Sequence, residues 1–419
     1  MSRKPSILLI NRVYPPARGA TGRMMQDLSR ALVENGWRVT VLSAVDNKLD
    51  KKKNKSKDEA LPEEQTSQIN QQVIKANLKG KSMLGYGLIW WRLLSKARRL
   101  PKHDVVLTMT DPPMMVYLGR LVARRKKSKH VHWCQDMYPD LLPALKVNLP
   151  KIIVGILNKL SLKSLKKADQ IVTIGQCMKT RIQHKGVNAN KIKFIPNWAD
   201  FEVISPSADG NHLNLPEKIT AAARKPEEMF RDNSPKFRVL YAGTIGRAHP
   251  MRVILDAASI LAEHKEIEFT FVGDAGAHSV LANERTKRGL ENIKFIPFQP
   301  IEKLRRVMES GDLHLVTMRQ EAAAMLVPCK FYSGLMVGRP TIFAGPENTE
   351  IADVIHQYEC GAVVPPTDGH ALAEAIYQYR TDGDEWFNAQ EGALQAAQAY
   401  HPSRSLQDWL GLLEEVYQG

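Results

Sequence analysis

A glycine-rich loop near the start of the sequence has the composition of a phosphate-binding turn. It reads YPPARGATGR over residues 14–23 and joins the apolar run 7–10 to a helical pattern at 24–35. Gly19 and Gly22 allow the backbone to approach a ligand closely, and a helix N-terminus offers free N–H groups and a positive dipole end. The loop can therefore contact a phosphate or a substrate, although an ordinary tight turn has the same composition.

A second glycine turn, YAGTIGR at residues 241–247, follows another apolar run. Gly243 and Gly246 let backbone amides face a diphosphate, and Arg247 can neutralise it. Lys330 is a single cation in the apolar segment LVPCKFYSG, where a helix is expected to start. This lysine can bind a phosphate, although a lysine in such a position is usually a solvated surface residue. The alternative for the turn itself is a structural connection between a strand and a helix.

A carboxylate follows a third apolar run, in the segment HWCQDMYPD at residues 132–140. Asp136 is expected at the carboxyl end of a strand, where open α/β sheets bind their ligands. There it could accept a proton from an acceptor hydroxyl. A helix N-cap or turn role for Asp136 or Asp140 is the alternative, and composition alone favours that alternative.

The elements that must position these motifs alternate between strands and helices. Apolar runs predict strands at 7–10, 39–42, 104–107, 131–133, 170–174, 193–195, 238–241, 268–272, 293–295, 313–316, 341–343 and 362–364. Helical spacing predicts helices at 24–35, 152–165, 251–263 and 301–308. Strands alternating with helices predict parallel sheets covered on both faces. We therefore expect an α/β protein with two similar doubly wound domains that face a central cleft.

The length of 419 residues exceeds the usual size of a single hydrophobic core. A polar stretch with four prolines interrupts the pattern between the two strand series. We expect an N-terminal domain at 1–203, a linker at 204–235, a C-terminal domain at 236–402 and a final helix within 403–419. The Lys-, Glu- and Gln-rich segment 47–80 is interpreted as a solvated excursion, partly disordered or loosely helical.

Composition favours a reduced compartment and a peripheral membrane contact. The four cysteines form no CxxC pair, so a disulfide framework or a zinc site is not expected. No run reaches the ~20 apolar residues that span a bilayer, and the apolar run at 7–10 is too short for the core of a signal peptide. We expect a cytoplasmic protein at the inner face of the cytoplasmic membrane.

The net charge of +15 predicts an anionic partner. Trp90 and Trp91 lie among arginines, the apolar helix expected at 152–165 is interleaved with lysines, and residues 124–129 are strongly basic. These segments favour an anionic membrane surface. The alternative for 152–165 is an ordinary core-packed helix. No nucleic-acid-binding signature is present, so nucleic acid is not an expected partner, although nonspecific binding by the basic face is a competing hypothesis.

Taken in their order and spacing, the motifs resemble the family-four retaining glycosyltransferases of the GT-B fold. The resemblance covers nearly the whole chain and is nearest to the bacterial exopolysaccharide, O-antigen, colanic acid and N-acetylfucosamine transferase branch. Besides the three motifs above, it depends on IPNWAD at 195–200, FVGDAG at 271–276, VPCKFYSGLMVGRP at 327–340 and ECGAVVPPTDGHALAEAI at 359–376.

The resemblance implies an N-terminal domain for the acceptor and a C-terminal domain for the sugar nucleotide, with a last helix that crosses back to the first domain. It implies transfer of a sugar from a nucleoside diphosphate sugar to a lipid-linked saccharide acceptor, with retention and without a metal or other cofactor. The expected donor-binding residues are Gly19, Gly22, Gly243, Thr244, Gly246, Arg247, Lys330, Ser333 and Glu350. Asp136 is the expected acceptor-activating group.

The chain departs from the family pattern at its charged positions. Two glutamates eight residues apart are common in the family, and Met325 and Ser333 stand in their places. Ser333 can still offer a hydroxyl to the nucleotide ribose, and Glu350 is a candidate substitute acid; its alternative is an exposed carboxylate at a helix N-terminus.

The family's phosphate-binding arginine and lysine are replaced by Thr244 and His249. Arg247 and Lys330 would then have to supply the positive charge. Besides nucleic-acid binding, these replacements motivate a non-catalytic or impaired GT-B scaffold as a third hypothesis. A UDP-sugar epimerase on the same double-domain fold is a fourth.

Overall fold

The computed structural model describes residues 3–15, 17, 19–46, 69–76, 83–199, 236–273, 275–300 and 303–419. The chain divides into two units. Unit 1 comprises Met1–Leu142, Val147–Pro196 and Ser405–Gly419, and unit 2 comprises Pro143–Lys146 and Asn197–Arg404. The expected linker at 204–235 lies outside the described residues.

Unit 1 is built on a seven-stranded parallel sheet in the order β3-β2-β1-β4-β5-β6-β7. The strands are β1 (Ser6–Ile10), β2 (Arg38–Asp46), β3 (Asn70–Ala76), β4 (Val105–Thr108), β5 (Lys129–Cys134), β6 (Gln170–Thr173) and β7 (Ile192–Phe194). β1 and β4 are buried along their whole length, which explains their unbroken apolar runs.

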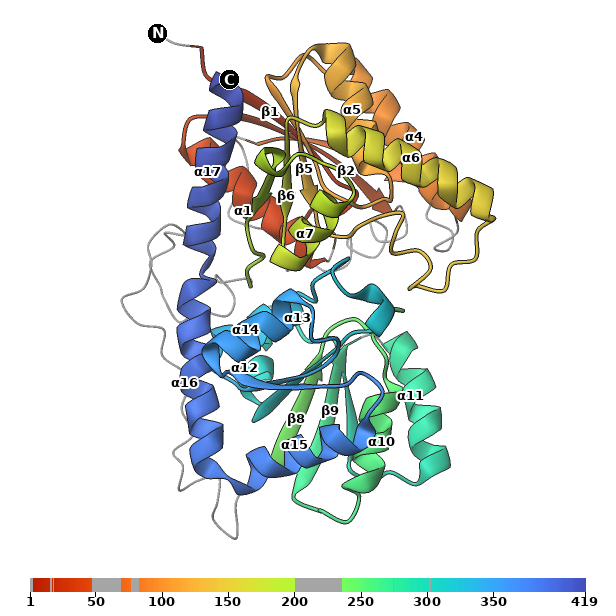
Figure 1. Cartoon of the computed structure of the whole chain (residues 1–419), viewed down its shortest axis with the longest axis vertical. Coiled ribbons are helices and arrows are strands. Elements are labelled where there is room, and N and C mark those ends of the chain that lie inside the picture. Colours follow the sequence, from red (N-terminus) through yellow and green to blue (C-terminus); the bar gives the residue numbers. More distant parts are fainter. Residues whose placement is uncertain are drawn as a thin grey trace. The chain divides into compact units, whose positions relative to one another are not determined.

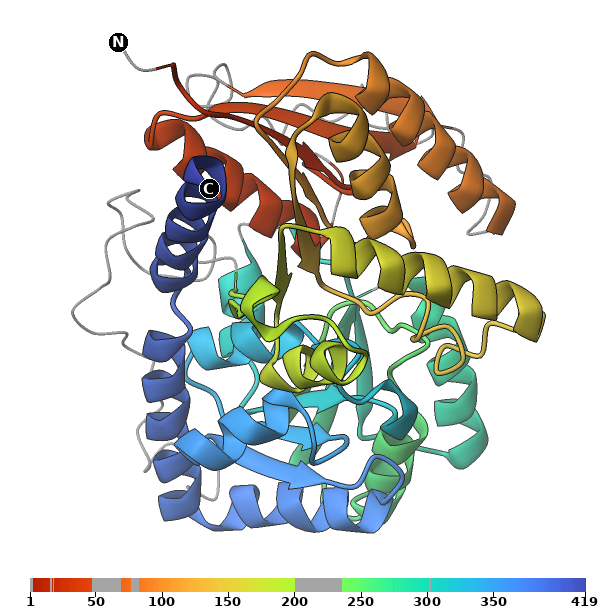
Figure 2. The ribbon, with the colours of Figure 1, turned by 45° about the horizontal axis from the view of Figure 1, so that its top comes forward.

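Helices cover both faces of this sheet (Figure 1). They are α1 (Ala20–Glu34), α4 (Met83–Arg99), α5 (Met115–Lys126), α6 (Lys151–Lys167) and α7 (Gln176–His184), with a 3-10 turn η1 (Ala189–Lys191) and most of α17 (Pro402–Gln418). Figures 1 and 2 both show α4, α5 and α6 next to one another on one face. Side chains of α4 and α5 pack there against alternate residues of the strands, among them Leu8, Ile10 and Val106.

The opposite face of the unit 1 sheet carries the end of the chain. Trp133 of β5 packs against Trp409 of α17 with ring centroids 4.6 Å apart, and both are fully buried. Trp37, which follows α1, meets Tyr417 at 5.8 Å. The hydroxyl of Ser405 donates a hydrogen bond to the Pro196 carbonyl at 3.1 Å. Residues 405–419 therefore complete the core of a unit whose other residues are more than two hundred positions away.

Unit 2 has a six-stranded parallel sheet in the order β10-β9-β8-β11-β12-β13. Its strands are β8 (Phe237–Ala242), β9 (Ile267–Gly273), β10 (Ile293–Pro297), β11 (Leu313–Thr317), β12 (Thr341–Ala344) and β13 (Gly361–Val364). Its helices are α10 (Arg252–Ile260), α11 (Ala275–Arg288), α12 (Leu304–Glu309), α13 (Lys330–Met336), α14 (Glu350–Tyr358), α15 (Gly369–Thr381) and α16 (Gly383–Ala399), with a 3-10 turn η3 (Gln320–Ala322).

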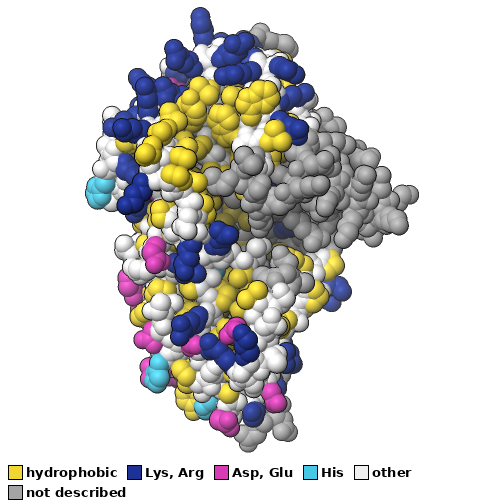
Figure 3. Space-filling view, turned by 90° about the vertical axis from the view of Figure 1, so that its right-hand side faces the viewer, with side chains coloured by type: hydrophobic (Ala, Val, Ile, Leu, Met, Phe, Trp, Pro, Cys, Tyr) yellow, Lys and Arg dark blue, Asp and Glu magenta, His cyan; other side chains and the backbone are white. Residues whose placement is uncertain are grey.

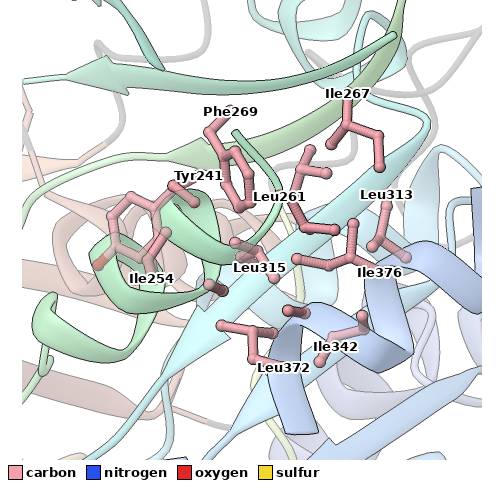
Figure 4. Close-up of a cluster of buried hydrophobic side chains, with 14 of the residues drawn as sticks. Tyr241, Ile254, Leu261, Ile267, Phe269, Leu313, Leu315, Ile342, Leu372 and Ile376 are labelled. Atoms are coloured by element: carbon pink, nitrogen blue, oxygen red, sulfur yellow. The ribbon is translucent and has the colours of Figure 1, made fainter. Parts of the chain in front are cut away.

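The core of unit 2 lies between the sheet and helices α10 and α15 (Figure 4). Phe269 and Leu315 point from the strands toward Ile254 of α10 and toward Leu372 and Ile376 of α15 (Figure 4). This interdigitation fixes the strand order and hence the position of the loops at the strand ends.

The strands and helices predicted from the sequence are confirmed, with shifts at their ends. α1 begins at Ala20 rather than at residue 24, because Gly19 is already its N-cap. The interpretation of 47–80 as an excursion without a strand is wrong in part. β3 (Asn70–Ala76) lies there and pairs with β2 along seven residues. It is an edge strand with a polar sequence, so it lacks the apolar run that marks the buried strands.

Candidate active site

The strand order changes direction at one place in each sheet. In unit 1 the chain leaves β1 toward β2 and later returns to its other side as β4, and β8 and β11 have the same relation in unit 2. Loops diverge at such a switch point, and ligands of open α/β sheets bind there, beyond the carboxyl ends of the strands. In unit 2 the turn after β8 carries several of the candidate residues, and in unit 1 the loops after β1 and β4 lie at this place.

The turn after β8 is made possible by two glycines. Gly243 has a φ of +113°, which disfavours any side chain, and its N–H donates to the Val272 carbonyl at 2.7 Å. A Cβ at Gly273, the last residue of β9, would lie 2.5 Å from the Gly243 carbonyl oxygen. A side chain at Gly273 would therefore force the ends of β8 and β9 apart.

Lys330, the first residue of α13, reaches back to this turn. Its Nζ donates to the Thr244 carbonyl at 2.9 Å and lies 5.1 Å from the centre of the Tyr241 ring. Burial lowers the pKa of Lys330 to about 8. Within the described part of the chain no carboxylate pairs with the ammonium group. A half-buried cation at a glycine turn is suited to an anionic ligand.

His249 stands beside this lysine. Its Nδ1 donates to the carbonyl of Thr317, the last residue of β11, at 2.6 Å. Burial, followed by the positive charge of Lys330, lowers the pKa of His249 to about 3. The backbone N–H of His249 donates to the Gly246 carbonyl at 3.0 Å. The imidazole therefore connects the turn after β8 to the end of β11 and is neutral at neutral pH.

Other predicted donor residues lie at different distances from this turn. Arg247 is exposed on the turn, and its carbonyl accepts a hydrogen bond from Arg319 Nε at 2.7 Å. Ser333 is half-buried one helical turn after Lys330 in α13. Glu350 is the first residue of α14, is 3% exposed and accepts a hydrogen bond from the Tyr400 hydroxyl at 3.2 Å. Glu350 is thus buried rather than exposed at its helix N-terminus, and its nucleotide contact stays a prediction.

In unit 1, Asp136 lies two residues after the end of β5. Burial is the larger cause and the negative charge of Asp111 the smaller one in raising the pKa of Asp136 to about 7. No hydrogen bond or ion pair from the described residues reaches its carboxylate, and its carbonyl accepts from Tyr138 N–H at 3.0 Å. An unpaired carboxyl group with a pKa near neutrality has the proton affinity of a general base.

A bidentate ion pair joins the ends of β1 and β4 at the same switch point. Arg12 donates from Nε and from a terminal nitrogen to the two carboxylate oxygens of Asp111, at 2.8 and 2.6 Å. The guanidinium also lies 5.8 Å from the ring centre of Tyr86. The pair was not predicted from the sequence, although Asp111 follows the end of β4 much as Asp136 follows the end of β5.

A small pocket adjoins Asp136 on the α5 and α6 side of the sheet. Its lining residues come from the ends of β4 and β5 and from α5, α6 and α7: Thr110, Met114, Met115, Val116, His132, Cys134, Asp136, Met137, Tyr138, Asp140, Ser161, Leu165 and Ile182. His132 is buried and shares the Thr108 hydroxyl with His130, each at 3.1 Å. Burial lowers the pKa of each histidine to about 3, so both are neutral.

The loop before α1 contains the remaining predicted residues. A Cβ at Gly22 would lie 2.9 Å from Val13 Cγ1 and 3.2 Å from the backbone of Tyr14, so the glycine lets α1 start against the end of β1. A Cβ at Gly19 would meet the same Val13 atom at 2.9 Å. No side chain caps α1. Packing explains both glycines, and their contact with donor phosphates stays a prediction.

The structure thus gathers Gly243, Thr244, Gly246 and Lys330 at one turn of unit 2, and Asp136 at the corresponding edge of unit 1. His249 and Asp111 were not among the predicted site residues. Among the described residues no three His, Cys, Asp or Glu side chains form a group that could hold a metal ion. No helix in the described part of the chain combines the length and the apolar character needed to cross a membrane.

Two family models match consecutive parts of the chain. Residues 21–203 match the model of Glycosyltransferase Family 4, and residues 236–382 match the model of Glycosyl transferases group 1. The chain belongs to glycosyltransferase family 4. This glycosyltransferase therefore transfers a sugar from a nucleotide sugar.

Two curated relatives of this glycosyltransferase come from bacteria. WcaI of Escherichia coli, named as a colanic acid biosynthesis glycosyl transferase, is 29% identical over 298 residues, which is 68% of each chain. WbjE of Pseudomonas aeruginosa, named as a glycosyltransferase, is 26% identical over 288 residues, 68% of this chain and 67% of its own.

The fold is GT-B, as in solved glycosyltransferases. HepE of Anabaena, in a crystal structure with UDP and glucose, superposes with a TM-score of 0.69 at 15% identity, covering 98% of this chain and 100% of its own. WaaG, described as a glycosyltransferase involved in lipopolysaccharide biosynthesis, has a TM-score of 0.64 at 14% identity, with coverages of 96% and 99%.

Proposed function

We propose that this glycosyltransferase is a metal-independent, retaining enzyme that moves a sugar from a nucleoside diphosphate sugar to a lipid-linked saccharide in the biosynthesis of a bacterial cell-surface polysaccharide. The observation that carries the proposal is the cation at the glycine turn after β8. Lys330 is half-buried there, hydrogen-bonded only to a backbone carbonyl among the described residues, and aimed at the carboxyl edge of the sheet.

The donor diphosphate would bind at this turn. Gly243 and Gly246 leave the backbone accessible, and Lys330 supplies positive charge against the charge that develops on the leaving diphosphate. Arg247, exposed on the same turn, can add to it. A crystal structure of the fold relative HepE with UDP-glucose supports a donor of this chemical class.

The acceptor hydroxyl would be activated by Asp136. Its pKa of about 7 lets it exist as a carboxylate at neutral pH and still accept a proton. The neighbouring pocket, with its apolar walls and the polar edge of His132, has the mixed character of saccharide-binding surfaces. The names of WcaI and WaaG support an acceptor that belongs to a cell-surface polysaccharide.

A membrane contact would be made by the outer surface of α4 and α6. The exposed side chains there include Leu88, Trp91, Ile152, Ile153 and Ile156. Helices α4, α5 and α6 carry Lys and Arg but no Asp or Glu. Figure 3 shows hydrophobic side chains gathered in the upper part of the view, with Lys and Arg side chains around them. Apolar side chains bordered by cations suit an anionic lipid surface.

Only a short part of α6 is buried, which bears on the alternative that α6 is an ordinary core-packed helix. Its buried residues are Ser161, Ser164 and Leu165, all in its second half. The first half presents isoleucines to solvent, so core packing does not account for its apolar composition.

The test is thermal stabilisation by UDP, GDP, ADP, dTDP and their sugars. A ligand at about 100 times its Kd stabilises a protein by about 2.7 kcal/mol. We expect one nucleotide class to raise the Tm of the wild type, with most of the shift lost in Lys330→Ala and part of it in Arg247→Ala. Lys287→Ala is the control, because Lys287 is an exposed residue of α11 in the same unit.

No shift with any nucleotide would contradict the proposed donor site and favour the non-catalytic scaffold. A shift that survives Lys330→Ala unchanged would place the diphosphate elsewhere. Product formation from a donor alone, without an acceptor, would instead support an epimerase.

A further inference from the structure

His249 is held so that only one of its ring nitrogens is free to bind a ligand. Nδ1 lies 2.6 Å from the Thr317 carbonyl oxygen, which can only accept, so Nδ1 carries the proton of the neutral ring. No hydrogen bond from the described residues reaches Nε2. The ring lies at the glycine turn, because a Cβ at Gly246 would be 3.5 Å from His249 Cδ2.

The ionisable groups packed around this ring are cationic or neutral. Lys330 of α13 acts on it electrostatically, and the Tyr241 ring of β8 lies under the lysine. Arg319, which follows β11, donates from its backbone N–H to Ala248 at 2.9 Å and from Nε to the Arg247 carbonyl. No carboxylate of the described residues contributes to the field at His249. Among the described residues, the positive charge at this turn is therefore not balanced by a nearby carboxylate.

We infer that a nucleoside diphosphate sugar that binds at this turn causes His249 to take up a proton at Nε2, so that the imidazolium and Lys330 together hold the diphosphate. The inference rests on the proposed donor site and adds a binding residue to it. The proton comes from solvent, and no covalent bond other than N–H is formed or broken.

The electrostatics give the direction of the effect. Without ligand, burial and Lys330 keep the ring neutral, with a pKa of about 3. The negative diphosphate favours the charged ring, so the pKa of His249 is higher in the complex than in the free protein. Donor affinity then falls as the pH rises from the pKa that His249 has in the free protein to the higher pKa that it has in the complex, and it is constant above that pKa.

The experiment measures proton uptake by calorimetry with UDP-, GDP-, ADP- and dTDP-glucose. Titrations at about pH 6.5, close to the ordinary pKa of histidine, in two buffers of different ionisation enthalpy give the protons bound per ligand. The diphosphate of a nucleotide sugar has no group that titrates near neutrality, and Lys330 is already charged at that pH because its pKa is about 8. Uptake therefore reports on other protein groups.

His249→Asn is the decisive variant. Its amide nitrogen can donate to the Thr317 carbonyl as Nδ1 does, but it has no group to protonate. We expect the wild type to take up a substantial fraction of one proton, and the variant to take up almost none and to bind about tenfold more weakly. His370→Asn is the control, because His370 has a side chain that is 71% exposed on α15.

Binding by the wild type without proton uptake would overturn the inference and leave the donor site intact. Undiminished uptake in His249→Asn would also overturn it, since another group would then bind the proton. Failure of all four nucleotide sugars to bind would overturn the donor site and the inference with it.

Discussion

In this glycosyltransferase, burial shifts the pKa values of one acidic and one basic side chain toward pH 7. The pKa of Asp136 rises to about 7 and that of Lys330 falls to about 8, and desolvation is the largest cause in both cases. Neither group has an oppositely charged partner among the described residues. The charge of each group can therefore change when a substrate binds. Side chains with such shifted pKa values and no charged partner are typical of functional sites rather than of structural ion pairs.

The first prediction concerns proton transfer by Asp136. Asp136→Asn removes the group that accepts the proton, so we expect turnover to fall by about 10²- to 10⁴-fold while donor binding stays unchanged. In the wild type the rate should rise with pH through about 7, because the carboxylate is the active form. The measurement is transfer of radiolabelled sugar to a lipid-linked acceptor fraction. Asp408→Asn, on the exposed side of α17, should behave like the wild type.

The second prediction concerns Asp111, whose charge raises the pKa of Asp136. Asp111→Asn removes that charge, so the pKa of Asp136 should fall and the rising limb of the pH–rate profile should move to lower pH. A profile that keeps its position while the rate falls would assign Asp111 a purely structural role through its ion pair with Arg12.

At the scale of elements, the donor turn depends on how closely two strand ends approach. The third prediction is that Gly273→Ala lowers the free energy of unfolding by about 1–3 kcal/mol, because its Cβ would overlap the Gly243 carbonyl oxygen at 2.5 Å. Nucleotide affinity should fall as well, since the turn must shift. Denaturant titration and the thermal-shift panel measure the two effects.

Gly411→Ala is the control, because we expect it to increase the free energy of unfolding rather than to decrease it. Gly411 lies inside α17, and outside the helix's own backbone no atom of the described residues lies within 4 Å of the position of a Cβ. Its substitution should raise the free energy of unfolding by about 0.5–1 kcal/mol, since alanine favours the helix. Equal destabilisation by both substitutions would contradict the steric account of Gly273.

At the scale of the molecule, charge and exposed apolar surface are distributed unevenly. The fourth prediction is that Ile152→Glu combined with Ile156→Glu weakens binding to vesicles rich in phosphatidylglycerol, by about tenfold for each isoleucine that no longer inserts. Both side chains are more than half exposed on α6. Co-sedimentation at low and high salt measures binding, which should also weaken as salt rises.

Val280→Glu is the matched control for the membrane contact. Val280 is 65% exposed on α11 of unit 2, outside the three basic helices. If Val280→Glu weakened vesicle binding as strongly as the α6 variant, the contact would not be specific to the surface of α4 and α6.

The sequence by itself determined the elements and the class of fold. Strands buried on both faces are rich in apolar residues, so the apolar runs of β1 and β4 were evident, and the glycine turns marked the strand ends that carry the site. The polar strand β3 was missed because its sequence QQVIK has little apolar signal, as expected for a strand that is paired on one side only among the described residues. The resemblance of ordered motifs then identified the family.

The tertiary structure decided which polar residues meet. From the sequence, His249 was noted only as the residue that replaces the family's phosphate-binding lysine. Folding places it against Thr317, 68 residues away, and beside Lys330. Arg12 and Asp111 are 99 residues apart and form one bidentate pair. Glu350, a candidate nucleotide ligand by its position, is buried against Tyr400. Local sequence fixes secondary structure through periodicity, whereas charge pairing and pKa depend on distances and burial that exist only after the strands have been ordered in a sheet.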